Sequence, residues 1–132
     1  MCITRFMPVL GVLLESLCVS PLAVLGAPGD VAGEIAAPCK YPSGLASDGT
    51  HLFVADWRDA KIYQVDPATG AVVRQFDAPT LKPHGLACAD GRLFVSDDHT
   101  GGIYTLNLQT GVVDNYFEAP DRSATGLAYH DG

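Results

Sequence analysis

The 132-residue chain has room for one ordinary domain, and its 48% hydrophobic and 17% charged residues are typical of a packed globular protein. Eight Lys and Arg against fifteen Asp and Glu give a net charge of −7. Such a negative field repels the phosphates of nucleic acids and of acidic membrane surfaces, which argues against nucleic-acid and membrane-surface binding.

The first 26 residues have the pattern of a secretion signal. Arg5 supplies a positive charge, and residues 6–26 are largely apolar. Glu15 and two prolines interrupt this run, whereas a permanent transmembrane helix needs roughly 20 uninterrupted apolar residues. The pattern predicts a signal peptide over 1–26, cleaved near Ala27, and a secreted protein with no membrane attachment after cleavage. An uncleaved anchor and a structural start are the alternatives.

A 41-residue repeat fills most of the remaining chain. Segments 42–82 and 83–123 are identical at sixteen of 41 positions, and the register extends outward at both ends. The recurring motifs are P-S-G-L-A at 42–46 with P-H-G-L-A at 83–87, and L-F-V-A-D at 52–56 with L-F-V-S-D at 93–97. Self-similarity at such a period is typical of folds built from one repeated supersecondary unit.

Each repeat divides into four short strands without helical spacing. In the first repeat we expect strands that begin at Gly44 and that cover 51–55, 61–65 and 71–76. Asp48-Gly49, and Asp90-Gly91 in the next repeat, are hairpin signals. Asp56, like Asp97 one repeat later, is expected to close its strand by bonding backbone N–H groups in an Asx-turn.

Four antiparallel strands per roughly 40 residues are typical of a β-propeller blade, so we predict an all-β propeller; a β-sandwich is the weaker alternative. The predicted parts are the last strand of one blade over 29–38, a blade over 42–79, a blade over 83–120, and the first strand of the next blade over 124–132. Together they form a partial β-propeller over 27–132.

This arrangement is an incomplete ring, because propellers close with about four to eight blades. The printed sequence ends at Asp131-Gly132, in the turn that should lead into another second strand. We therefore expect a fragment of a longer product that supplies additional blades. Self-association of several copies into a ring is the alternative.

The pattern P-x-G-L-A…D-G…L-F-V-A-D…I-Y-x-V-D-P-x-T-G resembles the repeats of NHL, SMP-30/gluconolactonase and streptogramin-lyase-like propellers. The resemblance covers residues 29–132, while the G-H and W-D marks of WD40 blades are absent. It implies a secreted or periplasmic-type propeller with ligands at the central mouth.

The residues just before the recurring Gly-Leu-Ala are candidates for that mouth, because the loop before the innermost strand of a blade lies near the propeller axis. They are Ser43, His84 and Thr125. The resemblance implies that histidines near the mouth bind metal or act as general base, which makes His84 the foremost of the three. A polar lining of the mouth without catalytic work is the simpler alternative.

Two further groups stand at loop tips. Trp57, beside Arg58, is a candidate recognition aromatic, with a packing role as the alternative. The run Asp97-Asp98-His99 has metal-capable side chains, but neighbours on one hairpin seldom provide the geometry that an ion needs, so we expect no metal there.

Two cysteines, Cys39 and Cys88, remain after signal cleavage. In an oxidising compartment they could pair. Cys39 is expected in a loop and Cys88 in a buried strand more than one repeat later, so unpaired thiols are the preferred interpretation. No CxxC or CxxH spacing indicates zinc.

No catalytic or nucleotide-binding motif occurs, so two hypotheses stand. The first is a secreted binding module whose partner is a protein, a glycan or a small molecule. The second is a truncated or divergent metal-dependent lyase or lactonase-type hydrolase, which would use a divalent metal with ligands partly outside this chain. The sequence itself identifies no cofactor.

Overall fold

The computed structural model describes residues 27–131. The predicted signal peptide over 1–26 lies outside the described residues. The chain divides after Glu34 into two units, and all strands belong to the second, which begins at Ile35.

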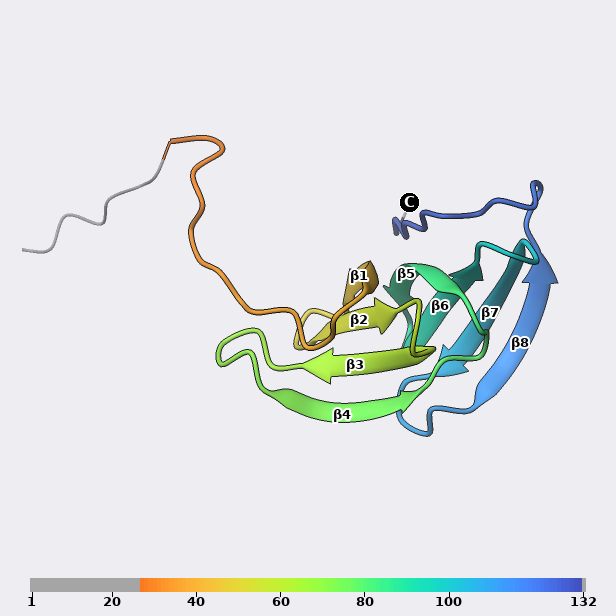
Figure 1. The fold of residues 1–132 in the computed structure, drawn as a ribbon, viewed down its shortest axis with the longest axis horizontal. Coiled ribbons are helices and arrows are strands. Elements are labelled where there is room, and N and C mark those ends of the chain that lie inside the picture. The colour runs from red at the N-terminus through yellow and green to blue at the C-terminus, as the bar shows by residue number, and fades with distance from the viewer. Residues whose placement is uncertain (1–26, 132) are drawn as a thin grey trace, which may run out of the picture. The chain divides into compact units, whose positions relative to one another are not determined.

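The described chain contains eight strands and no helix. Figure 1 labels these strands along the ribbon. They form two four-stranded antiparallel sheets, in the orders β1-β2-β3-β4 and β5-β6-β7-β8. The all-β prediction and its four-strand units are therefore confirmed. The strands are β1 (Pro42–Ser47), β2 (Leu52–Asp56), β3 (Lys61–Val65), β4 (Val72–Asp77), β5 (Pro83–Ala89), β6 (Arg92–Asp97), β7 (Gly102–Asn107) and β8 (Val113–Glu118).

The first hairpins of the two blades differ in detail. Asp90 and Gly91 both have positive φ, 48° and 72°, as a two-residue type I′ turn requires, and this prediction is confirmed. In the first blade the last pair is Ser47 with Leu52, so Asp48-Gly49 lies in a wider loop. There the Asp48 carboxylate accepts hydrogen bonds from the backbone N–H groups of Thr50 and His51, in place of a further ladder pair.

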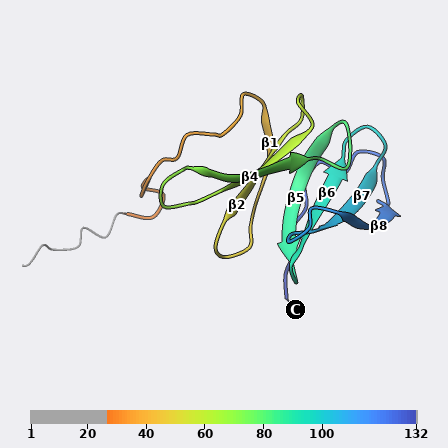
Figure 2. The ribbon, with the colours of Figure 1, turned by 90° about the horizontal axis from the view of Figure 1, so that it is seen from below.

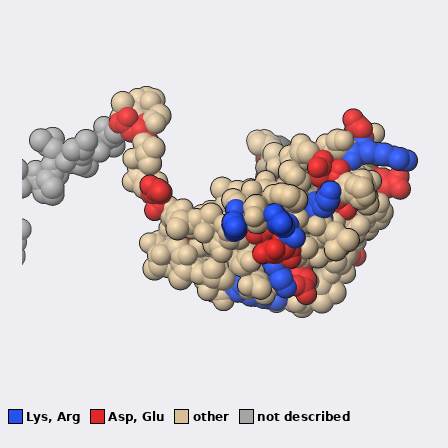
Figure 3. Space-filling model, viewed as in Figure 1, with Lys and Arg blue, Asp and Glu red and all other residues tan. Residues whose placement is uncertain are grey.

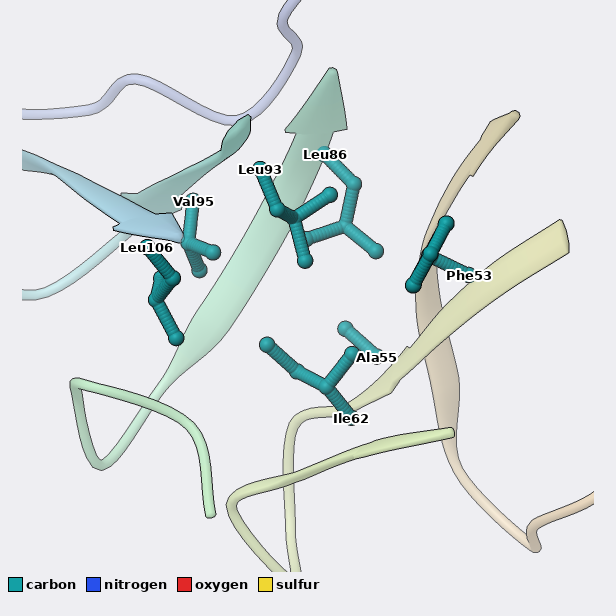
Figure 4. Close-up of a cluster of buried hydrophobic side chains, with 7 residues drawn as sticks. All are labelled: Phe53, Ala55, Ile62, Leu86, Leu93, Val95 and Leu106. Atoms are coloured by element: carbon teal, nitrogen blue, oxygen red, sulfur yellow. The ribbon is translucent and has the colours of Figure 1, made fainter. Parts of the chain in front are cut away.

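The core lies between the two sheets. Its side chains come from β2 and β3 of the first blade and from β5, β6 and β7 of the second, and each is at most 3% exposed (Figure 4). The innermost strands β1 and β5 lie side by side (Figure 2). Burial of these apolar groups is what joins the blades. The cluster comprises Phe53, Ala55, Ile62, Leu86, Leu93, Val95 and Leu106.

Glycine at the start of β1 permits this close approach. A Cβ placed on Gly44 would lie 2.1 Å from the carbonyl oxygen of His84 and 3.0 Å from Cγ of Leu86. A side chain of any size would therefore push β5 away from β1.

The expected terminal strands are not formed. No residue in 29–38 or in 124–131 is in a strand. A strand requires a ladder partner, and the described residues give neither range one.

Candidate functional site

The loops before the innermost strands and the loops after the second strands meet at one end of each blade. The register pairs Pro42 with Asp56 and, one repeat later, Pro83 with Asp97. Antiparallel pairing thus places the start of one strand beside the end of its neighbour. We call this end of the two blades the loop end.

Asp56 fixes the loop end of the first blade. Its side chain is fully buried and accepts hydrogen bonds from the backbone N–H of Arg58 (2.8 Å), Asp59 (3.0 Å) and Tyr41 (3.3 Å). Burial opposes ionisation, but these bonds outweigh it and lower the pKa of the Asp56 carboxyl. The expected Asx-turn is confirmed.

Asp97 repeats this arrangement in the second blade. Its carboxylate accepts bonds from the backbone of His99 (2.7 Å) and from the hydroxyls of Thr80 and Thr100. Burial again opposes ionisation, and these bonds again lower the pKa of the Asp97 carboxyl. Because its oxygens are engaged, Asp97 is poorly placed to bind a metal.

Cys39 takes the position in the first blade that Thr80 holds in the second. Its thiol donates to Asp56, and burial together with that carboxylate raises the thiol pKa. Cys39 and Cys88 are both unpaired, as expected. Cys88 is half-buried rather than buried, and desolvation raises its pKa to about 11.

The three mouth candidates occupy equivalent places but have different surroundings. The Ser43 hydroxyl donates to the carbonyl oxygen of Pro83 at 2.7 Å, so it ties the first blade to the second. Nε2 of His84 lies 3.9 Å from Oδ2 of Asp98, and both side chains are partly exposed. Thr125 is exposed. In successive repeats, the equivalent position therefore holds a serine hydroxyl that joins the blades, a histidine near a carboxylate, and an exposed threonine.

Trp57 belongs to a cluster that sequence reasoning missed in part. Its ring meets that of Tyr41 edge-on, with centroids 5.9 Å apart, and Trp57 is 40% exposed. The Arg58 guanidinium lies 4.9 Å from the Tyr41 centroid, and the Lys40 ammonium lies 5.5 Å from it. These are cation–π distances. We call these four residues the aromatic–cation cluster.

The second blade has the same backbone without these side chains. The backbone N–H of Trp57 donates to the Tyr41 carbonyl at 3.2 Å, and the backbone N–H of Asp98 donates to the Lys82 carbonyl at 3.4 Å. Lys82 and Asp98 stand where the first blade has Tyr41 and Trp57. The fold of the repeat therefore does not require the aromatic pair.

Charges at the surface are mixed. On the face shown in Figure 3, basic side chains lie beside acidic ones rather than in one broad positive field. Over residues 27–131, no group of three His, Cys, Asp or Glu side chains is placed to hold a metal ion. In that same range no helix is long and apolar enough to span a membrane.

Comparisons with known proteins show the fold. No family model and no curated protein matches the chain. Among solved structures, similar ones are Myxococcus xanthus glutaminyl cyclase (19% identity, TM-score 0.59), a chain of a nidogen/laminin complex (18%, 0.56) and virginiamycin B lyase from Staphylococcus aureus (20%, 0.53).

These alignments cover 69%, 66% and 71% of this chain and 40%, 34% and 33% of the other chains, in the same order. The chain thus spans about a third to two fifths of the proteins that it resembles. The neighbours are propeller-type proteins, so the two sheets are β-propeller blades. Because some neighbours are enzymes and others are not, the likeness does not extend to function.

Proposed function

We propose that the chain is part of a secreted β-propeller, akin to the NHL, SMP-30/gluconolactonase or streptogramin-lyase-like propellers, whose loop end binds a protein partner. The aromatic–cation cluster is the observation that carries this proposal. Trp, Tyr and Arg supply most of the energy at protein interfaces. The secreted part of the proposal rests on the sequence of residues 1–26.

The absence of the cluster from the second blade supports a binding role. Two blades with one backbone differ at the positions of Tyr41 and Trp57, so folding alone does not select aromatic residues there. Trp57 is also 40% exposed, which leaves aromatic surface in contact with water unless a partner covers it.

Charge indicates what kind of protein surface would fit. Within residues 27–131, Lys61 and Arg92 form ion pairs with Asp77 and Asp114, whereas Lys40 and Arg58 form none. A partner that offers a carboxylate beside an apolar side chain would complement both halves of the cluster. One structural neighbour comes from a nidogen/laminin complex, an assembly of two proteins, which agrees with this proposal.

Site-specific photocrosslinking tests the proposal. A photoreactive phenylalanine at position 57 should crosslink to one protein in the secreted fraction, whereas the same probe at position 98, its equivalent in the second blade, should not. With the purified captured protein, Trp57→Ala should weaken binding about 30-fold, equivalent to ~2 kcal/mol, because truncation removes a hot-spot aromatic.

Asp98→Ala is the matched control and should leave that affinity unchanged. Equal loss in both variants, or unchanged affinity in Trp57→Ala, would contradict the proposal. Capture of a glycan, or binding of the purified protein elsewhere on the chain, would replace it with another kind of recognition.

The His84–Asp98 pair favours a second candidate function, the metal-dependent lyase or lactonase. Nε2 of His84 and Oδ2 of Asp98 are 3.9 Å apart, which is too long for a hydrogen bond but close enough for both atoms to turn toward one bound ion. Further ligands would then come from other blades.

A manganese or zinc titration followed by NMR tests this candidate. The ring signals of His84 should respond at submillimolar metal, and Asp98→Asn should abolish the response. If His130, which forms no ion pair with a carboxylate within residues 27–131, responds equally, the candidate fails.

A further inference from the structure

A hollow of about 310 Å³ opens beside the aromatic–cation cluster, on the same loop of the first blade. Residues 57–60 connect β2 to β3; Trp57 and Arg58 belong to the cluster, whereas Asp59 and Ala60 line the hollow. The other wall is the segment that leaves the end of β4 toward β5. The full lining comprises Asp59, Ala60, Lys61, Asp77, Ala78, Pro79, Thr80 and Leu81.

The hollow exists because the chain cannot pack closely against Ala60. Gly101 is the equivalent residue of the second blade, and a Cβ there would lie 2.6 Å from Cα of Arg122. Ala60 itself carries a Cβ, so Leu81, the equivalent of Arg122, has to lie farther out. Ala60 and Gly101 both have positive φ, 50° and 72°, which glycine adopts with less strain than alanine. The first blade therefore keeps a methyl group where the second blade packs backbone.

Hydrogen bonds fix both walls of the hollow. The backbone N–H of Ala78 donates to the Ala60 carbonyl at 2.8 Å, and the buried Thr80 hydroxyl donates to Asp97. On the loop, the backbone N–H of Asp59 donates to the buried Asp56 carboxylate at 3.0 Å. A site whose walls are already ordered loses less entropy when a ligand enters.

The rim of the hollow has an excess of negative charge. Asp59 stands on the loop and Asp77 at the end of β4, where the Lys61 ammonium is bound to Asp77. The Asp77 side chain is still 83% exposed, and within residues 27–131 Asp59 forms no ion pair. The hydrogen bond and charge of Asp77, and more weakly the charge of Asp59, raise the pKa of Lys61. Two carboxylates against one ammonium leave an uncompensated negative charge.

Apolar side chains form the rest of the lining, and the outermost of them, Leu81, is 85% exposed. A long aliphatic stem with a cationic end fits such a site, because the stem covers Leu81 and Pro79 while the charge reaches carboxylates on both walls. Arginine fits better than lysine, since the planar guanidinium has five donors and can bond two carboxylates at once.

We propose that this hollow receives an arginine side chain of the protein partner that binds the aromatic–cation cluster; the proposal thus rests on the proposed function. The cluster offers unpaired cations to a carboxylate, and the hollow on the same loop offers carboxylates to a cation. The partner's surface then carries an acidic and a basic side chain, each beside apolar groups. Complementary charges of opposite sign at two places also fix the register of the complex.

A matched pair of peptides tests the hollow by itself. Acetyl-Leu-Arg-Leu-amide should shift the NMR signals of Ala60, Ala78 and Leu81 in the full chain. The same peptide with citrulline in place of arginine has nearly the same shape but no charge. It should bind at least about tenfold more weakly, because the charge-assisted hydrogen bonds are lost.

Three substitutions separate recognition from folding. Asp59→Asn should weaken binding of the arginine peptide about fivefold, and Lys61→Gln should strengthen it about threefold because it removes a competing ammonium. Glu118→Gln is the control, since Glu118 is the equivalent of Asp77 in the second blade, and it should change nothing. Weaker binding in both Asp59→Asn and Lys61→Gln would indicate a disturbed loop and would overturn the proposal.

The protein captured through position 57 completes the test. Asp59→Asn should weaken its binding by about the same factor as that of the peptide, and Glu118→Gln should not. Unchanged affinity in Asp59→Asn would overturn the arginine assignment, while capture at position 57 would still support the proposed function.

The peptides also distinguish the other occupants. Equal binding of the citrulline peptide would show that charge is not recognised, and equal binding of free agmatine would make a small cation the occupant; either result overturns the proposal. Binding of the arginine peptide with no protein captured at position 57 would refute the proposed function, and with it the partner named for the hollow.

Discussion

Replacing Gly44 by alanine should destabilise the two-blade unit by about 3 kcal/mol, the upper part of the usual range for overpacking. The added Cβ would lie 2.1 Å from the carbonyl oxygen of His84, which is backbone and cannot rotate away. The blades would have to separate and expose part of their shared core. Urea unfolding followed by tryptophan fluorescence measures the loss, because Trp57 is the only tryptophan.

The repeat provides graded controls for this substitution. Gly85→Ala should cost less, since its nearest contacts are 2.8–3.0 Å and one of them is the Ser96 hydroxyl, a side-chain atom rather than backbone. Gly126→Ala should change the free energy of unfolding by no more than about 0.5 kcal/mol, because nothing lies within 4 Å of its Cβ position. Equal effects at all three positions would show that close approach does not set the blade spacing.

Asp56→Ala should lower the free energy of unfolding by about 3 kcal/mol, because it leaves buried N–H groups without an acceptor. The carboxylate holds both the loop after β2 and the loop before β1 through Arg58, Asp59 and Tyr41. Asp66→Ala is the matched control: it removes bonds to the N–H of Ala68 and Thr69, but at an exposed turn. That loss should stay below about 1 kcal/mol.

Acid should act on the same carboxylates. The pKa values of Asp56 and Asp97 are lower in the folded chain than the usual 3.8. Their contribution to stability is therefore complete above pH 3.8 and is lost as the pH falls through the folded values. Urea unfolding between neutral pH and pH 2 should show this decline, with a weaker decline in Asp56→Ala. An unchanged pH dependence in that variant would contradict the assignment.

The repeat made much of the fold predictable. Strand positions follow from the 41-residue period, and Asp90-Gly91 identifies its turn because two successive positive φ angles suit few other pairs. The wide loop after Ser47 was not predictable, because Asp48 bonds the backbone where a ladder pair was expected. The strands expected over 29–38 and 124–132 are absent from the described residues of these ranges, because sequence pattern cannot supply a partner strand.

The candidate site was predictable only in part. Trp57 was identified from its place at a loop tip, but Tyr41 lies sixteen residues earlier and meets it only through the pairing of Pro42 with Asp56. That pairing is implied by the hairpin and was the available signal. The use of the Ser43 hydroxyl across the blade interface depends on packing between sheets, which no local pattern encodes.

The exposed edge strand β8 affects the solubility of the chain. β8 ends its sheet and is exposed at every residue, so one row of its backbone groups is free to template another chain's strand. Glu118 places a carboxylate along that edge, whereas the Asp114 carboxylate is paired with Arg92. A strand of a second molecule that paired in parallel register would bring two Glu118 carboxylates together, which opposes cross-β aggregation.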